Sequence, residues 1–160
     1  NVNEGFIAYR LYTDGRGKWN YTVPAGGSEM PTTAETLKNG KQFFQMNGRA
    51  VYETATKALP KAIFQVLEDT GLSIDNINLM IPHQPSIKIL EETARIIKLP
   101  FNKVMTNMDK YANTSGATIP LLLDETRRDG KIKNGDYILF AAVGSGWTYG
   151  AAIMKWSLGK

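Results

Sequence analysis

Three stretches of the chain place apolar residues at the spacing of an amphipathic α-helix, about three to four residues apart. Residues 47–71 carry on one face Val51, Ala55, Leu59, Ile63, Val66 and Leu67. Residues 85–100 carry on one face Ile87, Leu90, Ala94 and Ile97. A third run covers residues 117–129. The pattern predicts three helices, each with one side packed against a core.

Proline and glycine mark where these helices begin, bend and end. Pro85 suits the first turn of the second helix, where a missing backbone N–H costs little, and Pro100 marks its end. Gly130 suits the position just after the third helix, because glycine adopts a left-handed conformation without strain. Pro60 lies inside the first helix and removes one of its hydrogen bonds, so we expect a kink or a break there.

Other stretches are apolar or rich in β-branched and aromatic residues without helical spacing, which is typical of strands. They are residues 4–12, 77–81, 104–108, 136–143 and 147–156. Residues 18–23 follow a turn-forming segment and are a candidate return strand for the first of these. Residues 24–40 are rich in Gly, Pro, Ser and Thr, and we expect them to form a long loop.

The alternation of helices and strands through the middle of the chain favours the α/β class, in which helices cover a sheet. We expect residues 77–81, 104–108, 136–143 and 147–156 to lie in one mixed β-sheet flanked by the three helices. The last two strands are joined through Gly144-Ser145-Gly146, so we expect them to form an antiparallel hairpin. Residues 1–160 are expected to form one domain.

The composition is that of a soluble globular domain, with 42% hydrophobic and 21% charged residues. No apolar run approaches the roughly 20 residues that cross a bilayer, so no membrane partner is expected. The first residues carry neither the basic segment nor the hydrophobic stretch of a secretory signal, and the chain does not begin with Met. We therefore expect a cytoplasmic protein, of which this chain is one piece.

The absence of cysteine and the distribution of charge exclude further classes of functional site and partner. The chain contains no cysteine, which excludes disulfides, zinc–thiolate sites and a thiol nucleophile within it. Its net charge is +4, but the Lys and Arg residues are scattered and not interleaved with aromatic residues. We therefore interpret the charge as a solvated surface and expect no nucleic-acid partner.

Two polar strings contain candidate functional residues. His83, the only histidine, directly follows the strand predicted at residues 77–81, and the carboxyl ends of strands are where α/β folds place ligand sites. By itself, His83 is explained equally well as a structural histidine. Asn113 lies at a turn before the third helix, from which an amide can donate to a developing negative charge. Capping of that helix by Ser115 explains the same string without any chemistry.

A third string, at residues 144–150 (GSGWTYG), has the spaced glycines of a nucleotide-binding loop. Such a loop needs a helix after its glycines, because the helix N-terminus holds the phosphate. Here the glycines are followed by an aromatic and apolar pattern that predicts a strand, so we reject that interpretation. A tight hairpin that brings backbone N–H groups close to a ligand is the better interpretation.

Taken together and in this order, the three strings resemble the ketoacyl synthase III family of the thiolase-like superfamily. The C-terminal half of that family carries Pro-His-Gln-Ala-Asn, Gly-Asn-Thr-Ser and Gly-Gly-Gly-Phe-Thr-Trp-Gly motifs. Here they read PHQPS at residues 82–86, ANTS at 112–115 and GSGWTYG at 144–150. The likeness extends from about residue 5 to 156. It implies the C-terminal half of a thiolase-like fold, without the N-terminal half that bears the cysteine.

The resemblance also implies an acyltransferase of fatty-acid synthesis with a Cys-His-Asn site. The cysteine takes an acyl group from a coenzyme A thioester, and malonyl–acyl-carrier protein then loses CO2 and condenses with it. His83 and Asn113 donate hydrogen bonds to the malonyl thioester oxygen, and the backbone N–H of Ser145 serves a second oxyanion. Gly48 and Ser86 are implied as substrate-binding residues. No metal or cofactor is implied, and the full-length protein is expected to be a homodimer.

Several positions depart from the family pattern. Ser145 replaces a glycine, which would cause strain if φ is positive there. Val143 replaces a Phe beside the site, and Pro85-Ser86 replaces Ala-Asn along the path of the substrate arm. Lys88 replaces an Arg that meets the acidic carrier protein, which keeps the charge but loses the two-pronged donor. These changes leave the acyl primer open. The missing cysteine leaves an alternative: a non-catalytic thiolase-fold subunit that pairs with a separate Cys-bearing chain.

Overall fold

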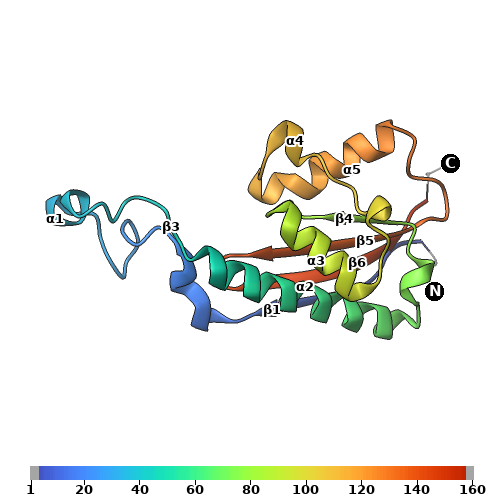
Figure 1. Cartoon of the computed structure of the whole chain (residues 1–160), viewed down its shortest axis with the longest axis horizontal. Coiled ribbons are helices and arrows are strands. Elements are labelled where there is room, and N and C mark those ends of the chain that lie inside the picture. Colours follow the sequence, from blue (N-terminus) through green and yellow to red (C-terminus); the bar gives the residue numbers. More distant parts are fainter. Residues whose placement is uncertain (1–3, 158–160) are drawn as a thin grey trace.

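The sheet that organises the structure has four strands in the order β1-β6-β5-β4. In this computed structural model, which describes residues 4–157, they are β1 (Gly5–Thr13), β4 (Leu79–Pro82), β5 (Tyr137–Gly144) and β6 (Thr148–Lys155). β4 is parallel to β5, whereas β6 is antiparallel to both of its neighbours. The expected mixed sheet and the final antiparallel hairpin are therefore confirmed (Figure 1).

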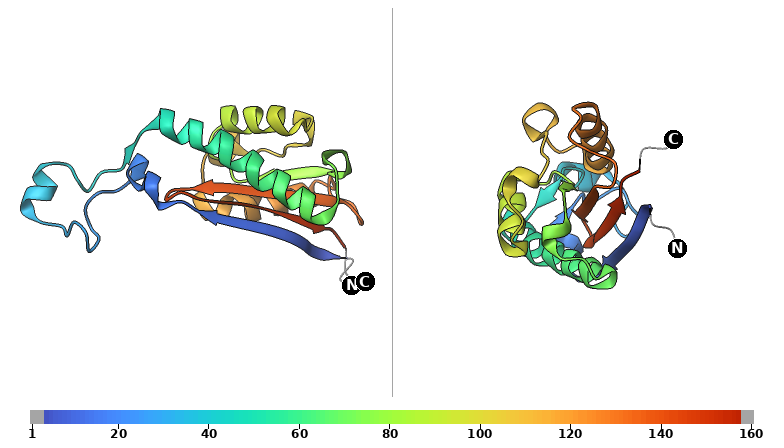
Figure 2. Two further views of the ribbon diagram at one scale, coloured as in Figure 1. Left: turned by 90° about the horizontal axis from the view of Figure 1, so that it is seen from below. Right: turned by 90° about the vertical axis from the view of Figure 1, so that its right-hand side faces the viewer.

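Helices lie on both faces of this sheet (Figure 2). α2 (Gly48–Thr70) and α3 (Ile87–Ile97) pack on one face, and α5 (Thr118–Arg128) lies on the other beside β4. Successive strand residues point to opposite faces, so β5 serves both layers. Leu139 and Ala141 are buried in the core with α2 and α3, whereas Ile138 and Phe140 are buried with Leu122 of α5.

α2 is a single helix in spite of Pro60. It begins after Asn47, whose side-chain oxygen accepts a hydrogen bond from the N–H of Ala50 at 3.1 Å, and ends at Gly71 with φ of 67°. The expectation of a break at Pro60 is wrong. Buried residues continue along α2 on both sides of the proline, so packing on the sheet outweighs the one lost backbone hydrogen bond.

The second helix begins later than expected. α3 starts at Ile87, and Ser86 is its N-cap residue, so Pro85 lies before the helix and not in its first turn. Ile87 was expected on the buried face but is 41% exposed. The helix buries instead Ile89, Leu90, Thr93, Ala94 and Ile97. The predicted end of the third helix is confirmed by Gly130, which has a φ of 68°.

Residues 104–108 do not form the predicted strand. Val104 makes only an isolated parallel bridge to Met80 at the edge of β4. The chain then leaves the sheet, because the side chain of Asn107 bonds to Glu125 of α5 and the short helix α4 (Met108–Tyr111) follows directly. The apolar run therefore shows a partly buried edge segment and not a sheet strand.

Residues 18–23 do not return along β1 either. The chain forms a 3-10 helix, η1 (Gly15–Asn20), and then β2 (Tyr21–Thr22), which pairs with β3 (Gln45–Met46) in a separate small sheet. Asp14 and Trp147 exchange backbone hydrogen bonds of 2.7 and 2.5 Å, so the chain leaving β1 is bonded to the β5–β6 hairpin. The expected return strand at residues 18–23 is therefore wrong, since β1 pairs with β6 and not with the segment that follows it.

Between β2 and β3 the chain extends away from the body as an arm of residues 23–44 (Figures 1 and 2). The expected long loop of residues 24–40 is largely present, but it also contains the short helix α1 (Ala34–Lys38). Thr33 starts this helix, and its side-chain oxygen accepts from the N–H of Thr36 at 3.1 Å. The reciprocal bond from the Thr33 N–H to the Thr36 hydroxyl completes a capping box.

An apolar stripe lies on the face of β1 that α5 leaves uncovered. Phe6, Tyr9 and Leu11 are 61%, 66% and 73% exposed. Phe6 pairs with Met154 and Tyr9 with Ala152, two residues of β6 that pack on the α5 side of the sheet. Exposed apolar patches of this kind mark surfaces that another body covers.

We therefore expect the isolated chain to associate with itself through this stripe, and Leu11→Lys to shift it towards the monomer. Light scattering over a range of concentrations measures the change in mass. Leu37→Lys is the matched control, because Leu37 is an exposed leucine of α1 in the arm, at 47%. A monomer at high concentration for the unsubstituted chain would contradict this expectation.

Candidate active site

A cavity of about 630 Å³ opens at the carboxyl ends of β4 and β5. Its wall contains all six residues that the sequence placed at the site: Gly48, His83, Ser86, Lys88, Asn113 and Ser145. They come from α2, from the loop and helix after β4, from the segment before α5 and from the β5–β6 hairpin. No spacing within one helix or strand brings them together, so the tertiary fold does.

His83 follows β4 and is held at both its backbone and its ring. Its N–H donates to the carbonyl of Ala141 at 2.8 Å, which extends the parallel pairing with β5. Its Nδ1 lies 3.1 Å from the hydroxyl oxygen of Thr118. Burial lowers the pKa of His83 below its ordinary value of 6.5, and the backbone of Ser115 opposes this to a smaller extent. The ring is therefore neutral near pH 7.

The hydrogen bonds of Thr118 indicate which ring nitrogen carries the proton. The single hydroxyl proton of Thr118 is donated to the carbonyl of Ser115 at 2.6 Å. The same oxygen accepts from the hydroxyl of Thr114 at 3.3 Å, so towards His83 it acts as an acceptor as well. Nδ1 of His83 must then be the donor, and Nε2 of the neutral ring carries no proton. Nε2 donates a hydrogen bond only when the ring is protonated.

The lowered pKa of His83 predicts a loss of stability in acid. The unfolded chain binds a proton at this ring more readily than the folded chain, so the stabilising contribution of the neutral ring is present above about pH 6.5 and is lost as the pH falls below it. Melting temperatures between pH 5 and 7.5 should therefore fall less steeply for His83→Asn than for the unsubstituted chain. Parallel curves would contradict the burial argument, because both chains share every other titrating group.

Asn113 is positioned by its own turn. Its side-chain oxygen accepts a hydrogen bond from the N–H of Ser115 at 2.9 Å, so the NH2 group is the end of the amide left to meet a ligand. The capping interpretation of this string is wrong, because α5 begins without a side-chain cap and Ser115 contributes only backbone groups to the turn. Asn113 is thus placed as a donor on the cavity wall.

Ser145 sits in the β5–β6 hairpin without strain. Among residues 4–157, the non-glycine positions with positive φ are Lys98, Ala112 and Ser115, so the replacement of glycine at 145 carries no left-handed conformation. The positive φ of the hairpin, 137°, falls on Gly146. The hydroxyl of Ser145 donates to the carbonyl of Tyr21 and so ties the hairpin to the base of the arm.

The three remaining predicted residues lie around the rim of the cavity. Ser86 is the N-cap residue of α3, but its hydroxyl makes no capping bond. Lys88 is exposed in the first turn of the same helix, and Gly48 is the first residue of α2. All three are on the cavity wall, which leaves their side chains or backbone available to a bound molecule.

Sequence reasoning missed the part of the wall that the base of the arm provides. Tyr21, Phe44 and Met46 line the cavity, and the rings of Tyr21 and Phe44 meet edge to face at 4.4 Å between centroids. Trp147 also lines the cavity and is buried against the backbone of Gly17, where an added Cβ would come within 1.9 Å of the indole nitrogen. These contacts join segments that are far apart in the sequence, so no local sequence pattern predicts them.

Comparison with known sequences decides the family. The sequence model of the family described as "3-Oxoacyl-[acyl-carrier-protein (ACP)] synthase III C terminal" matches residues 67–156. The chain belongs to the 3-oxoacyl-[acyl-carrier-protein] synthase III family. It is 37% identical over 155 residues to the beta-ketoacyl-[acyl-carrier-protein] synthase III of Roseiflexus castenholzii, a match that covers 97% of this chain and 47% of the relative. For the synthase III of Caldanaerobacter subterraneus, identity is 40%, covering 96% and 46%.

Solved structures of synthase III proteins agree with this fold. The crystal structure of 3-oxoacyl-[acyl-carrier-protein] synthase III from Aquifex aeolicus matches with a TM-score of 0.84 and 30% identity, over 96% of this chain and 45% of that one. The chain therefore spans a little under half the length of its synthase III relatives. The fold class is that of the thiolase-like half expected from the sequence.

The structure offers neither a metal site nor a membrane-spanning helix among the residues it describes. Among residues 4–157, no group of three or more His, Cys, Asp or Glu side chains is placed to hold a metal ion. In the same residues, no helix is both long enough and apolar enough to cross a membrane.

Proposed function

We propose that this chain is the C-terminal catalytic half of a 3-oxoacyl-[acyl-carrier-protein] synthase III. The reaction is the decarboxylative condensation of an acyl-CoA primer with malonyl–acyl-carrier protein at the start of fatty-acid synthesis. The observation that supports it most is the convergence of His83, Asn113 and the backbone of Ser145 on one cavity from three separate parts of the chain. Structural residues would have no reason to meet there.

The nucleophile in this proposal is a cysteine supplied from outside the chain, since the chain contains none. Its sulfur takes the acyl group from the coenzyme A thioester. The malonyl thioester then loses CO2, and the electrons of the broken C–C bond move onto the thioester oxygen. The resulting carbanion attacks the acyl carbon, and the cysteine leaves as the new C–C bond is made. The stabilisation of the thioester oxygen is the part assigned to this chain.

His83 and Asn113 stabilise that oxygen from two sides. The NH2 group of Asn113 donates directly, because its oxygen is engaged with Ser115. Developing negative charge beside His83 raises the pKa of the ring, which takes up a proton from solvent and donates from Nε2. The family resemblance implied that both side chains donate to this oxygen, and in the proposal His83 does so as a protonated ring. Preorganised donors at developing charge are typically worth ~3–4 kcal/mol each.

The remaining residues fit the path of the substrates. Gly48 and Ser86 lie where the arm of coenzyme A or of the carrier protein passes. Lys88 is exposed beside the cavity, where its charge attracts the acidic carrier protein. The whole protein is proposed to be a cytoplasmic homodimer that needs no metal or cofactor. The acyl primer is left open, because much of its pocket belongs to the other half.

Co-expression with a Cys-bearing N-terminal half of the Caldanaerobacter subterraneus synthase III tests the proposal. We expect the two halves to condense acetyl-CoA with malonyl–acyl-carrier protein, while each half alone forms no product. The missing cysteine also favours the alternative of a non-catalytic subunit. In that case, activity of a complex with a complete partner chain would survive His83→Ala in this chain. A stable complex of the two halves that forms no product would overturn the proposal.

A further inference from the structure

The turn that carries Asn113 is backbone-strained at the residue before it. Ala112 has φ of 54° and ψ of −148°, a conformation that glycine adopts freely and other residues do not. Such a conformation persists only where the surrounding structure holds it. Three residues after Ala112, Ser115 also has a positive φ, of 55°. The direction of the Asn113 side chain therefore depends on whatever fixes the chain on either side.

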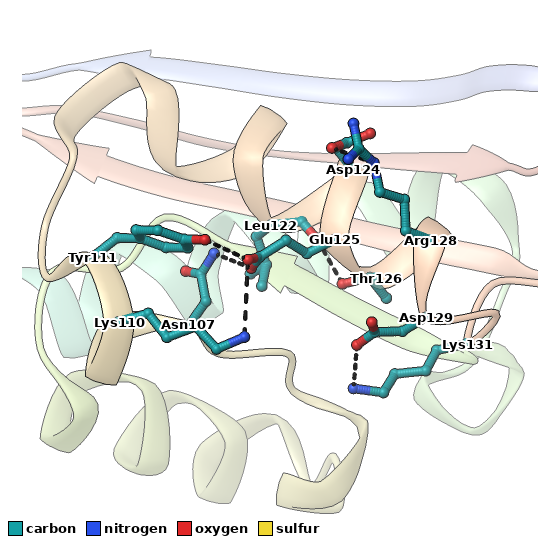
Figure 3. A network of polar contacts seen from close by, with 10 residues as sticks. All are labelled: Asn107, Lys110, Tyr111, Leu122, Asp124, Glu125, Thr126, Arg128, Asp129 and Lys131. Atoms are coloured by element: carbon teal, nitrogen blue, oxygen red, sulfur yellow. Dashed lines mark hydrogen bonds and ion pairs between the residues drawn. The ribbon is translucent and has the colours of Figure 1, made fainter.

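The chain before Ala112 is fixed by one carboxylate, that of Glu125 on α5. Its Oε2 accepts from Nδ2 of Asn107 at 2.8 Å, and its Oε1 accepts from the hydroxyl of Tyr111 at 2.8 Å. The Nζ of Lys110 lies 3.9 Å from the same Oε1 (Figure 3). Asn107 is the N-cap residue of α4 and Tyr111 is its last residue, so the carboxylate of Glu125 is hydrogen-bonded to both ends of this helix.

The position of α4 depends on these hydrogen bonds with Glu125, because the helix is too short to be stable by itself. It has four residues, far fewer than the dozen or so that a helix needs for stability on its own. Asn107 is its N-cap residue but makes no capping bond, because its amide reaches across to Glu125 instead. Asn107 is only 4% exposed, so losing this acceptor would leave a buried donor unpaired.

The ionisation of the group agrees with this geometry. The hydrogen bonds from Asn107 and Tyr111 lower the pKa of Glu125, and the carboxylate raises the pKa of Tyr111. Downstream of Asn113, Thr118 fixes the chain through the carbonyl of Ser115. The strained turn is thus held between Glu125 on one side and Thr118 on the other.

We propose that Glu125 is a positioning residue, which holds α4 in place, keeps Ala112 in its strained conformation and thereby aims the NH2 group of Asn113 into the cavity. Glu125 does not line the cavity and acts only through the chain it holds. The consequence for chemistry rests on the proposed function, whereas the hold on the turn does not.

Hydrogen exchange on the full chain tests the hold without any chemistry. In Glu125→Ala, the amides of Ala112 and Ser115 are expected to exchange at least ~10-fold faster, with a change in the NMR shifts of the Asn113 side-chain NH2. Glu125→Gln keeps one acceptor and should be intermediate. Asp124→Ala is the matched control, because Asp124 is the preceding residue on α5 but points away from the turn (Figure 3). Its Oδ2 lies 2.9 Å from Nε of Arg128, with which it forms an ion pair.

Ala112→Gly separates positioning from general destabilisation. Glycine adopts this conformation without strain, so adding Ala112→Gly to Glu125→Ala should restore most of the protection at Ser115. In the two-half enzyme, Glu125→Ala should slow malonyl-thioester decarboxylation ~10-fold on its own but hardly at all when Asn113 is already alanine. If Glu125→Ala does not fold, the same comparisons are made with Glu125→Gln.

Unchanged exchange at Ala112 and Ser115 in both Glu125 variants would overturn the proposal. An equal loss of activity with and without Asn113 would also overturn it, since that result describes a merely structural residue. An enzyme that shows no decarboxylation in any form would instead count against the proposed function, while the exchange result would still decide the hold on the turn.

Discussion

Alanine in place of His83 or Asn113 is expected to slow decarboxylation of the malonyl thioester by ~10²–10³-fold in the two-half enzyme, the range seen when one donor to an oxyanion is removed. Asn113 presents its NH2 group to the cavity, and His83 presents Nε2 as a donor once its ring is protonated. Neither can replace the other, because they come from different parts of the chain. Release of CO2 from malonyl–acyl-carrier protein measures the effect.

Acyl transfer from coenzyme A onto the cysteine should suffer less in the same variants, because its oxyanion uses backbone donors such as the N–H of Ser145. Asn102→Ala is the matched control for Asn113, since Asn102 is an exposed asparagine that does not line the cavity. A purely structural role predicts lower melting temperatures with normal chemistry in the folded fraction. Near-normal decarboxylation in a folded double variant would end the assignment.

The isolated chain is expected to form no acyl-enzyme with acyl-CoA, an all-or-none difference from the two-half enzyme. Thioester exchange needs a thiol, and the chain has no cysteine. Intact-mass measurement after incubation with acetyl-CoA should show the unmodified mass, whereas the Cys-bearing half in the complex should gain one acetyl group. A stoichiometric, hydroxylamine-labile adduct on this chain would contradict the expectation and point to a serine ester, with Ser86, Ser115 and Ser145 on the cavity wall as candidates.

The parts of the fold that local pattern determines could be predicted from the sequence. The helical spacing located α2, α3 and α5. The runs now seen as β5 and β6 were recognised because they are apolar on both faces, one face packing in the core with α2 and α3 and the other in the core with α5. Residues 104–108 were expected to be a strand on the same grounds, but they lie at the edge of β4 and form only one isolated bridge with it, between Val104 and Met80. Whether an apolar run becomes a strand depends on a neighbour that the run itself does not specify.

The candidate site could be predicted as far as short motifs carry it. His83, Asn113 and Ser145 were identified because each stands at a strand end or a turn in a recognisable string. The part of the cavity wall formed by Tyr21, Phe44 and Met46 could not be predicted, because it exists only where the base of the arm meets the β5–β6 hairpin. The proton position on His83 was also out of reach, since it follows from the contact with Thr118 of α5. For Ala112 the motif did hold a signal, because Ala112 stands where the family has the glycine that suits a positive φ.

The position of β6 between β1 and β5 sets the order in which the chain can fold. Gly5 pairs with Lys155, so the first strand described takes as its partner the last one. During synthesis β1 has no partner until almost all of these residues have left the ribosome. β1 therefore stays unpaired until β6 has been made, and this part of the sheet closes late. Nascent chains of this protein should for that reason depend on chaperones more than a domain whose neighbouring strands are consecutive.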